Sequence, residues 1–324
     1  MSNQISFPRL ASLDLFRGLT IVAMVLANFL AGPALVPAWL KHAKDVGLTV
    51  IDLIAPFFIF AVALTYRASF LRRAARYGLT NAYAQFVQRY LALIGVGTIL
   101  SAGEDWVGLL TVTHRWGVLE AIGVAGLIAL LAVRLPLPWL FAAGLGLLAA
   151  YQYLLDHFWL SIVLDSSHGG FEGALSWSAM LILAIALVEL FNNPRLREQI
   201  FPLAAALTLG LGCALSWLIP ISKNRVSAPY VLVSLGIGAL LFFICHIFCE
   251  RLGRRISLLE TWGQNPLALY LLHLLLLGVF ALVPIPGWYE QAPPWLILLQ
   301  GVFLIASLTA IAGFLKQRGW FLKL

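Results

Sequence analysis

Apolar stretches of about 20 residues follow one another along the chain, and short polar breaks separate them. Each stretch is long enough for a helix to cross the hydrocarbon core of a bilayer. The strands of a β-barrel would alternate polar with apolar residues, so these continuous stretches predict helices. We place about ten spans, at roughly 13–32, 48–66, 86–103, 115–133, 137–155, 174–191, 201–219, 228–249, 264–283 and 295–315.

The composition agrees with a protein that is largely surrounded by lipid. Of the 324 residues, 61% are hydrophobic and 11% are charged, and the mean hydropathy is +0.93. The spans leave no room for a soluble domain, so we expect one all-α polytopic transmembrane bundle over residues 1–324. The first span has no strongly basic segment before it and no small-residue cleavage site after it, which predicts a retained helix and not a removed signal peptide.

The positive charges are divided unevenly between alternate loops. If the N-terminus is cytoplasmic, most of the 21 Lys and Arg residues fall in cytoplasmic loops, as the positive-inside rule requires. The sequence therefore predicts that both termini are inside and that His42 is outside. The net charge of +7 is then a signal of topology, and we expect no nucleic-acid partner.

A few polar side chains lie in or beside the predicted spans, where a charge is costly, so each is a functional candidate. Asp52 begins the second span, and His42 precedes it in the outer loop. A facing imidazole lets the carboxylate stay ionised, and the carboxylate holds the imidazole in one tautomer. The alternative is that His42 is an ordinary polar residue of a wet loop. Asn28 lies near the outer end of the first span, and His273 lies inside the ninth.

Two further pairs of charged residues have two interpretations each. Asp14 and Arg17, three apart on one helix, are either a structural ion pair or part of a site for an anionic group. Lys223 and Arg225 lie on the outer side against the charge trend, which indicates either a function or an anchor for lipid headgroups.

The cysteines predict neither disulfides nor a metal site. Cys213, Cys245 and Cys249 all fall in predicted spans. Cys245, His246 and Cys249 are neighbours on one helix, but a fourth ligand is not evident, and packed thiols are the better interpretation.

Five stretches resemble, in this order, motifs of the heparan-alpha-glucosaminide N-acetyltransferase catalytic family and its bacterial relatives. They are "SLDLFRGLTIVAMVLAN", "HAKDVGLTVIDLIAPFFIF", "RWGVLEAIGV", "IPISKNRVSAPYVL" and "WGQNPLALYLLH". The resemblance runs from the first span to the ninth. It implies a transmembrane acyltransferase that takes an acetyl group from cytoplasmic acetyl-CoA and delivers it to an amino sugar on the other side.

The resemblance also implies roles for individual residues. His42 matches the active-site histidine, as a base or as a transient carrier of the acetyl group, and Asp52 matches the acidic residue that orients it. Contacts with the substrate or the thioester oxyanion are implied for Asn28, Asn265, His273 and Lys223. The chain departs from the family's "VLQR" pattern in the fourth span, where it has Glu120 and Ala121.

Acetyl-CoA carries phosphates, and basic residues near the cytoplasmic face are candidate partners for them. These are Arg17, Arg72, Arg73, Arg76 and Arg89. The alternative is that the cluster serves topology alone.

Two other functions stay open at this point. Ten spans with buried polar groups also suit a sugar permease, although we find no convincing repeat between the two halves of the chain. The same machinery could also O-acylate an envelope polysaccharide. The partners we expect are an amino-sugar or glycan acceptor and the lipid bilayer, in a bacterial inner membrane with His42 on the periplasmic side. The sequence leaves open the acceptor, the acyl length, an acetyl-histidine intermediate and whether a homodimer forms.

Overall fold

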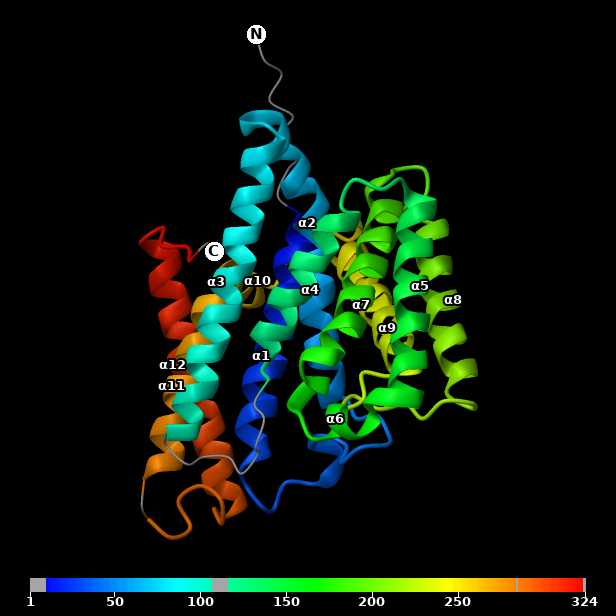
Figure 1. Cartoon of the computed structure of the whole chain (residues 1–324). Helices are drawn as coiled ribbons and strands as arrows, with labels where there is room; N and C mark the ends of the chain where they lie inside the picture. The colour runs from blue at the N-terminus through cyan, green and yellow to red at the C-terminus, as the bar shows by residue number, and fades with distance from the viewer. Residues whose placement is uncertain (1–9, 107–115, 284, 323–324) are drawn as a thin grey trace. The chain divides into compact units, whose positions relative to one another are not determined.

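The chain folds into helices throughout the residues that the computed structural model describes, which are 10–106, 116–283 and 285–322 (Figure 1). These helices form two compact units. The terminal unit contains Met1–Leu35 and Leu241–Lys323, and the central unit contains Val36–Leu240. The described residues form no β-strand, so the all-α prediction is confirmed.

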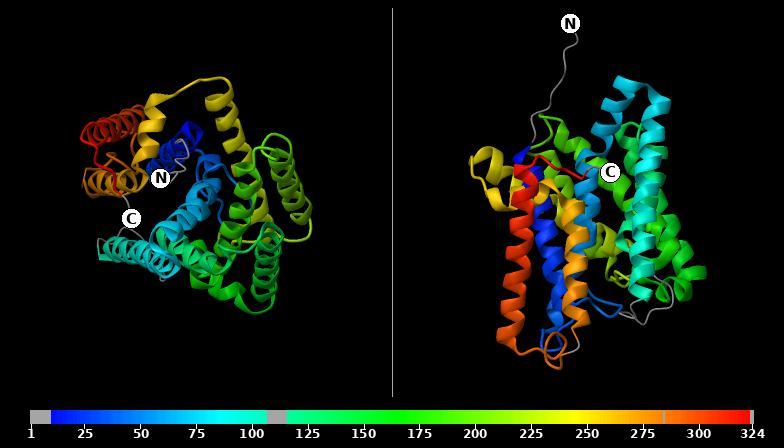
Figure 2. Two further views of the ribbon diagram at one scale, coloured as in Figure 1. Left: turned by 90° about the horizontal axis from the view of Figure 1, so that it is seen from above. Right: turned by 90° about the vertical axis from the view of Figure 1, so that its left-hand side faces the viewer.

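The central unit is built around α7. Nearly all of this helix is buried, including 89% of its apolar stretch. It packs against α2, α4, α5 and α8. Figure 2 shows α5 and α7 side by side. The helices of this unit are α2 (Ile54–Tyr77), α3 (Leu79–Trp106), α4 (Val118–Ala132), α5 (Leu137–Leu154), α6 (Leu160–Leu164), α7 (Gly170–Asn192), α8 (Ile200–Leu215) and most of α9 (Ala228–His246), with the short helical turns Ala38–Leu40, Ile51–Leu53, Leu155–Trp159 and Ser167–Gly169.

A tight turn joins the two longest helices of the central unit, α2 and α3. Gly78 lies between them with φ +83°, a conformation that glycine adopts without a steric penalty. Aromatic rings from both helices pack together after the turn, among them Tyr66 and Phe86, whose centroids are 5.3 Å apart. The two helices therefore run back along each other as a hairpin.

The terminal unit contains a broken helix. Its elements are α1 (Ala11–Ala31), the end of α9, the π-helical turn Ile247–Arg251, α10 (Ser257–Gln264), α11 (Pro266–Leu282) and α12 (Pro294–Gln317). The axes of α10 and α11 differ by 90°, because Pro266 has no N–H to continue α10 and disfavours the helical conformation of Asn265 before it. In Figure 2, α11 and α12 lie beside α1, which also packs against α10.

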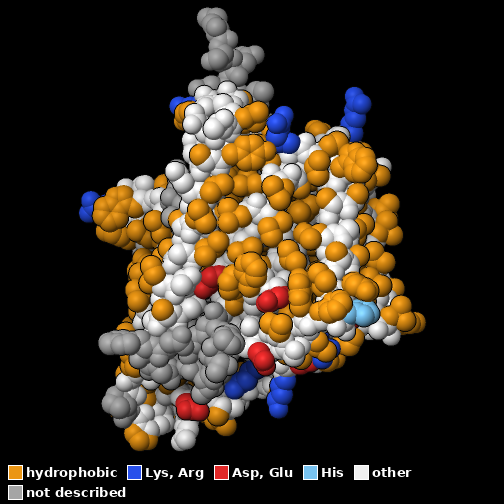
Figure 3. All heavy atoms as spheres, viewed as in Figure 1, with side chains coloured by type: hydrophobic (Ala, Val, Ile, Leu, Met, Phe, Trp, Pro, Cys, Tyr) orange, Lys and Arg blue, Asp and Glu red, His pale blue; other side chains and the backbone are white. Residues whose placement is uncertain are grey.

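Seven helices in the described residues are long and apolar enough to cross a membrane, or eight if the bent pair α10 and α11 counts as one span. With the bent pair counted as one span, two shorter apolar helices, α4 and α8, bring the number of apolar segments to ten. Each of the ten predicted ranges overlaps one of these segments. The number ten and the predicted orientation stay predictions. Hydrophobic side chains cover most of the surface over α5 (Figure 3), as expected for an integral membrane protein.

Candidate active site

Asp52 is the most enclosed charged residue among those described in the central unit, with no exposed surface. Its Oδ2 accepts hydrogen bonds from the Thr49 N–H at 2.9 Å, the Thr49 hydroxyl at 3.0 Å and the Ala43 N–H at 3.3 Å. The bonds with Thr49 arise locally, because a carboxylate three residues into a helical turn can reach back to the backbone N–H at its start. Tyr230 on α9 donates to the Asp52 carbonyl at 2.8 Å. One carboxylate oxygen is therefore held by three donors, and the backbone of Asp52 is held from α9.

His42 contacts the other oxygen of this carboxylate. Its Nδ1 lies 2.7 Å from Asp52 Oδ1. An ionised carboxylate only accepts hydrogen bonds, so Nδ1 carries the proton and Nε2 keeps its lone pair. The His42 side chain is 44% exposed. The arrangement gives a half-exposed imidazole in a fixed tautomer, with Nε2 available as a base or a nucleophile.

Lys223 completes the cluster from the loop before α9. Its Nζ lies 3.2 Å from His42 Nδ1, and the residue is 8% exposed. Since Nδ1 already donates to Asp52, Lys223 contributes its positive charge and not a hydrogen bond to this nitrogen. Burial lowers the pKa of Lys223 to about 8, although the charge of Asp52 acts in the opposite direction.

A second ion pair fastens the two loops that supply these residues. Arg225 Nε donates to Asp45 Oδ1 at 3.0 Å, and its Nη2 donates to Oδ2. The Ser222 hydroxyl adds a bond of 2.8 Å to Asp45 Oδ1, and Gly47 N–H donates to the Ile221 carbonyl at 2.8 Å. The guanidinium holds the pKa of Asp45 below its usual value, and Asp45 raises the pKa of Arg225. These bonds hold the loop of His42 against the loop of Lys223.

His168 is a neighbour of this cluster that the sequence analysis did not identify. It precedes α7, and its Nδ1 lies 3.1 Å from the Trp116 carbonyl. It interacts electrostatically with Lys223, His42 and Asp52. The only signal in the sequence is "SSHGGFEG" before an apolar run, in which a histidine precedes two glycines at the mouth of a predicted span.

Two of the predicted site residues meet in the terminal unit. Asn28 Nδ2 on α1 lies 2.9 Å from His273 Nε2 on α11, while His273 Nδ1 contacts the Tyr270 carbonyl. Nδ1 therefore carries the proton, and Nε2 accepts a hydrogen bond from the Asn28 amide.

Asn265, at the break between α10 and α11, holds the C-terminal segment. Its Nδ2 donates to the Trp320 carbonyl at 2.9 Å, and its Oδ1 accepts from the Leu322 N–H at 3.1 Å. Both polar ends of this amide thus have backbone partners in the structure.

The predicted phosphate ligands of the central unit lie on the hairpin of α2 and α3. Arg73 Nη1 donates to the Gln85 side chain at 3.3 Å, and Arg72 Nε donates to the Ala68 carbonyl at 3.3 Å. The Arg89 guanidinium lies over the Tyr90 ring, 5.7 Å from its centroid. Arg17, the remaining candidate, lies on α1 in the terminal unit.

Glu120, one of the two departures from the family pattern, is buried on α4 with 3% exposure. Its Oε1 accepts a hydrogen bond of 3.0 Å from the Ser101 hydroxyl, and Oε2 has no hydrogen-bond partner among the residues that the structure describes. Gly97 and Gly117 leave the room that this carboxyl group needs, because a Cβ at either position would collide with it. Ala121, the other departure, faces a narrow crevice that His168 also lines.

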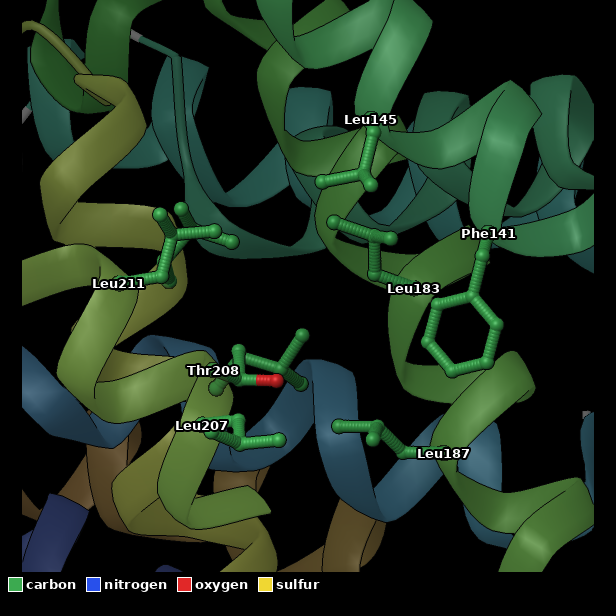
Figure 4. Close-up of a pocket in the computed structure, with 9 residues that line it drawn as sticks. Phe141, Leu145, Leu183, Leu187, Leu207, Thr208 and Leu211 are labelled. Carbon is green, nitrogen blue, oxygen red and sulfur yellow. The ribbon is translucent and has the colours of Figure 1, made fainter. Parts of the chain in front are cut away.

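A larger hollow of the central unit is unsuited to chemistry. It measures about 150 Å³ and lies among α5, α7, α8 and α9 (Figure 4). Leucines and Phe141 supply most of its lining, and its single hydroxyl, on Thr208, donates to the Ala204 carbonyl. No side chain that lines it can act as an acid, base or nucleophile.

Comparison with known proteins gives two findings. A family model described as "Heparan-alpha-glucosaminide N-acetyltransferase, catalytic" matches residues 9–248. The human protein named heparan-alpha-glucosaminide N-acetyltransferase is 32% identical over 127 residues, which cover 36% of this chain and 18% of the human protein. The family match includes His42, Asp52 and Lys223 and ends before Asn265 and His273.

Proposed function

Because the chain belongs to the heparan-alpha-glucosaminide N-acetyltransferase catalytic family, we propose that it moves an acetyl group from cytoplasmic acetyl-CoA to the amine of an amino sugar outside the membrane. The family is one of N-acetyltransferases, while the donor, the sidedness and the acceptor are parts of our proposal. We place the protein in a bacterial inner membrane with His42 on the periplasmic side. The apolar helices are consistent with an integral membrane protein.

The observation that carries this proposal is the contact between His42 and Asp52. The carboxylate accepts the Nδ1 proton at 2.7 Å, so Nε2 is the basic nitrogen, and it belongs to a half-exposed ring. An amine bound beside Nε2 attacks the thioester carbon and gives a proton to this nitrogen. The C–S bond then breaks, and the imidazolium returns the proton to sulfur to form the CoA thiol. Asp52 stabilises the imidazolium between these steps.

A second route uses Nε2 as the nucleophile, with an acetyl-histidine between two transfers. The geometry of His42 suits both routes. Incubation with labelled acetyl-CoA and no acceptor distinguishes them, because only the second route leaves label on His42.

The oxyanion that forms on the thioester needs hydrogen-bond donors, and removal of one such donor typically costs about 10²–10³-fold in kcat. Asn28 and Asn265 stay the predicted donors. His273, whose one N–H faces the Tyr270 carbonyl, stays a predicted substrate contact together with Lys223. The arginines Arg17, Arg72, Arg73 and Arg89 stay the predicted partners of the CoA phosphates. Guanidinium groups suit this role since they bind phosphate oxygens in pairs.

The test uses sealed proteoliposomes with a known orientation. Acetyl-labelled acetyl-CoA is supplied on the face that carries the termini, and glucosamine is supplied on the other. We expect labelled N-acetylglucosamine on the glucosamine side with the wild type and none with His42→Ala. His157→Ala is a matched control, because His157 is exposed on the turn after α5, where its ring contacts Tyr153 and Phe158 and no residue of the cluster.

Two other results would replace the proposal. If unmodified glucosamine crosses the membrane with both the wild type and His42→Ala while no label moves, the protein is a permease. If label appears on hydroxyl groups of an N-acetylated glycan and never on an amine, the protein is an O-acyltransferase. Transfer by His42→Ala at the wild-type rate refutes the role of His42 in either enzyme.

A further inference from the structure

Val226, in the loop before α9, has a backbone conformation that is costly for a β-branched residue. Its φ is +46°, in the left-handed region that glycine and asparagine adopt far more readily. Residues held in this region concentrate at functional sites when the surrounding structure enforces their conformation. Val226 is fully buried. The question is therefore what its side chain and its backbone hold in place.

Two backbone hydrogen bonds close this loop. The Ser227 N–H donates to the Ser222 carbonyl at 3.2 Å, and the Val226 N–H donates to the Lys223 carbonyl at 3.1 Å. This pair of bonds, with a left-handed residue at the fifth of six positions, is the pattern of the Schellman motif, in which glycine usually takes that position. Lys223 is the residue whose carbonyl Val226 binds. The direction in which the lysine leaves the loop therefore depends on the conformation of the valine.

Contacts with α7 and with the turn before it hold the valine. The Ser176 hydroxyl on α7 donates to the Val226 carbonyl at 2.7 Å. One methyl group of Val226 faces Gly169 and Gly173, where an added Cβ would approach it to 2.8 Å and 3.3 Å. Both distances are shorter than an ordinary contact, so the two glycines leave the room that this methyl group fills. The side chain thus anchors the loop on α7.

The turn that receives the valine is fixed as well. His168, Gly169 and Gly170 have φ values of +54°, +80° and +63°. The Trp177 Nε1–H on α7 donates to the His168 carbonyl at 3.0 Å. Because α7 is the buried centre of this unit, the anchor of Val226 belongs to its most enclosed part.

The other end of the loop brings an amine to the active site. Lys223 Nζ lies 3.2 Å from His42 Nδ1, and 8% of the residue is exposed. An ammonium on a flexible stem is strongly hydrated, so the amine stays at His42 only while the loop stays closed. The ion pair of Arg225 with Asp45 is partly exposed, and such pairs contribute little. Val226 supplies the buried anchor.

We propose that Val226 is a positioning residue of the active site: its side chain, held by α7 and the turn before it, keeps the loop closed and the Lys223 amine beside His42. This inference rests on the proposed function, in which Lys223 is a substrate contact. It goes beyond that function, because it gives a catalytic consequence to a residue that touches no reacting group. Relief of the backbone strain by glycine should then lower the activity.

The first test is a double-mutant cycle of Val226→Gly with Lys223→Met, measured as acetyl transfer to glucosamine in proteoliposomes. Glycine adopts the left-handed conformation without strain and removes the anchoring side chain. We expect kcat/KM of Val226→Gly to fall by about 10²-fold, because a misplacement of about 1 Å at an active site can cost this much. In the Lys223→Met background the same substitution should change kcat/KM by less than about threefold.

The second test needs no acetyl transfer. Burial lowers the pKa of Lys223 to about 8, so the melting temperature of the wild type should rise between pH 8 and about 10.4. The charged and titratable groups that act on this amine are His42, Asp52 and His168. If Val226→Gly releases the amine to water, the rise should be lost, as in Lys223→Met.

Two further variants separate positioning from packing. Val226→Thr keeps the branched shape and should retain most of kcat/KM, at some cost in stability from its buried hydroxyl. Val163→Ala truncates another fully buried valine of the same unit. It should lower the melting temperature and leave kcat/KM and the pH dependence unchanged. If Val226→Gly does not fold, Ser176→Ala loosens the same loop by removing the bond to the Val226 carbonyl, and we expect the same pattern in both tests.

Equal losses from Val226→Gly in the wild-type and Lys223→Met backgrounds would overturn the inference, because Val226 would then act on packing alone. An unchanged kcat/KM of Val226→Gly would overturn it as well, and so would a rise of its melting temperature with pH as steep as that of the wild type. Absence of transfer by the wild type is a different outcome. It refutes the proposed function, and the pH dependence of the melting temperature then decides the inference.

Discussion

Replacement of Asp52 by Asn tests the central contact of the site with almost no change in volume. Three donors, two from Thr49 and one from Ala43, surround the position of Oδ2, so the amide oxygen of Asn takes that place. The amide NH2 then points at His42 Nδ1, 2.7 Å from the present Oδ1. To receive this donor, Nδ1 must give up its proton, and the proton moves to Nε2. The variant therefore presents an N–H where the wild type presents a lone pair.

The expected loss follows from this change of tautomer. In a serine protease triad, the same substitution lowers kcat by about 10⁴-fold through the wrong tautomer, and we expect a loss of about 10³–10⁴-fold here. Stability also suffers, because Lys223 stays buried without its counter-charge. The loss is limited by the low pKa of Lys223, about 8, because the amine can give up its proton and stay buried in the neutral form.

The assay is acetyl transfer in proteoliposomes, with the melting temperature measured on the same preparation. Asp165→Asn is the matched control, because Asp165 is an exposed carboxylate in the same unit and outside the cluster. We expect its kcat and melting temperature to equal those of the wild type. A loss below about tenfold in Asp52→Asn would refute the tautomer argument. If a ligand restores the melting temperature of Asp52→Asn and acetyl transfer recovers with it, the substitution acts on folding and not on chemistry.

Three further predictions concern the same unit. Burial gives Lys223 a lower pKa in the folded state than in the unfolded chain, so the unfolded chain binds more protons between pH 8 and about 10.4. The melting temperature of the wild type should therefore rise with pH in this window. The melting temperature of Lys223→Met should lack this rise, and equal slopes for the two proteins contradict the prediction. Arg225→Ala should lower the free energy of unfolding by about 1 kcal/mol, because the ion pair of Arg225 with Asp45 is partly exposed. Exchange of the two residues, Arg225→Asp with Asp45→Arg, should recover part of this loss in thermal denaturation. Gly97→Ala should destabilise the protein by about 1–3 kcal/mol through collision with the Glu120 carboxyl group, and this loss should shrink in a Glu120→Ala background, whereas additive losses in the double-mutant cycle refute the contact.

Hydropathy located the helices but not their ends. The second and third spans were predicted to end at 66 and to begin at 86, whereas α2 continues to Tyr77 and α3 begins at Leu79. The missing turns carry arginines and polar residues, which hydropathy assigns to water, yet the backbone stays helical there because the two helices pack on each other. The break at Asn265 and Pro266 had a visible cause in proline, but its 90° angle depends on the packing of α10 on α1.

The site was predictable to the extent that its partners are close in the chain. His42 and Asp52 are ten residues apart, and Thr49 and Asp52 form a pattern that starts a helical turn, so their contacts follow from local geometry. Lys223 is 181 residues from His42, and only the resemblance pointed to it. His168 escaped prediction because its signal is a backbone conformation, which becomes visible only once Trp116 and Trp177 are placed around it.

The order of burial within the cluster favours chemistry over transport. Asp52 is fully buried and Lys223 nearly so, while His42 is half-exposed. A permease needs polar groups that are free to bind and release its cargo. Both carboxylate oxygens of Asp52 are instead occupied by the protein's own donors, and Nδ1 of His42 is occupied by Asp52. Among the residues that the structure describes, none is hydrogen-bonded to Nε2 of His42. A group that is rigidly held, correctly protonated and open on one side suits proton transfer to and from a bound molecule, and this is why the contact between His42 and Asp52, and not the number of spans, carries the functional argument.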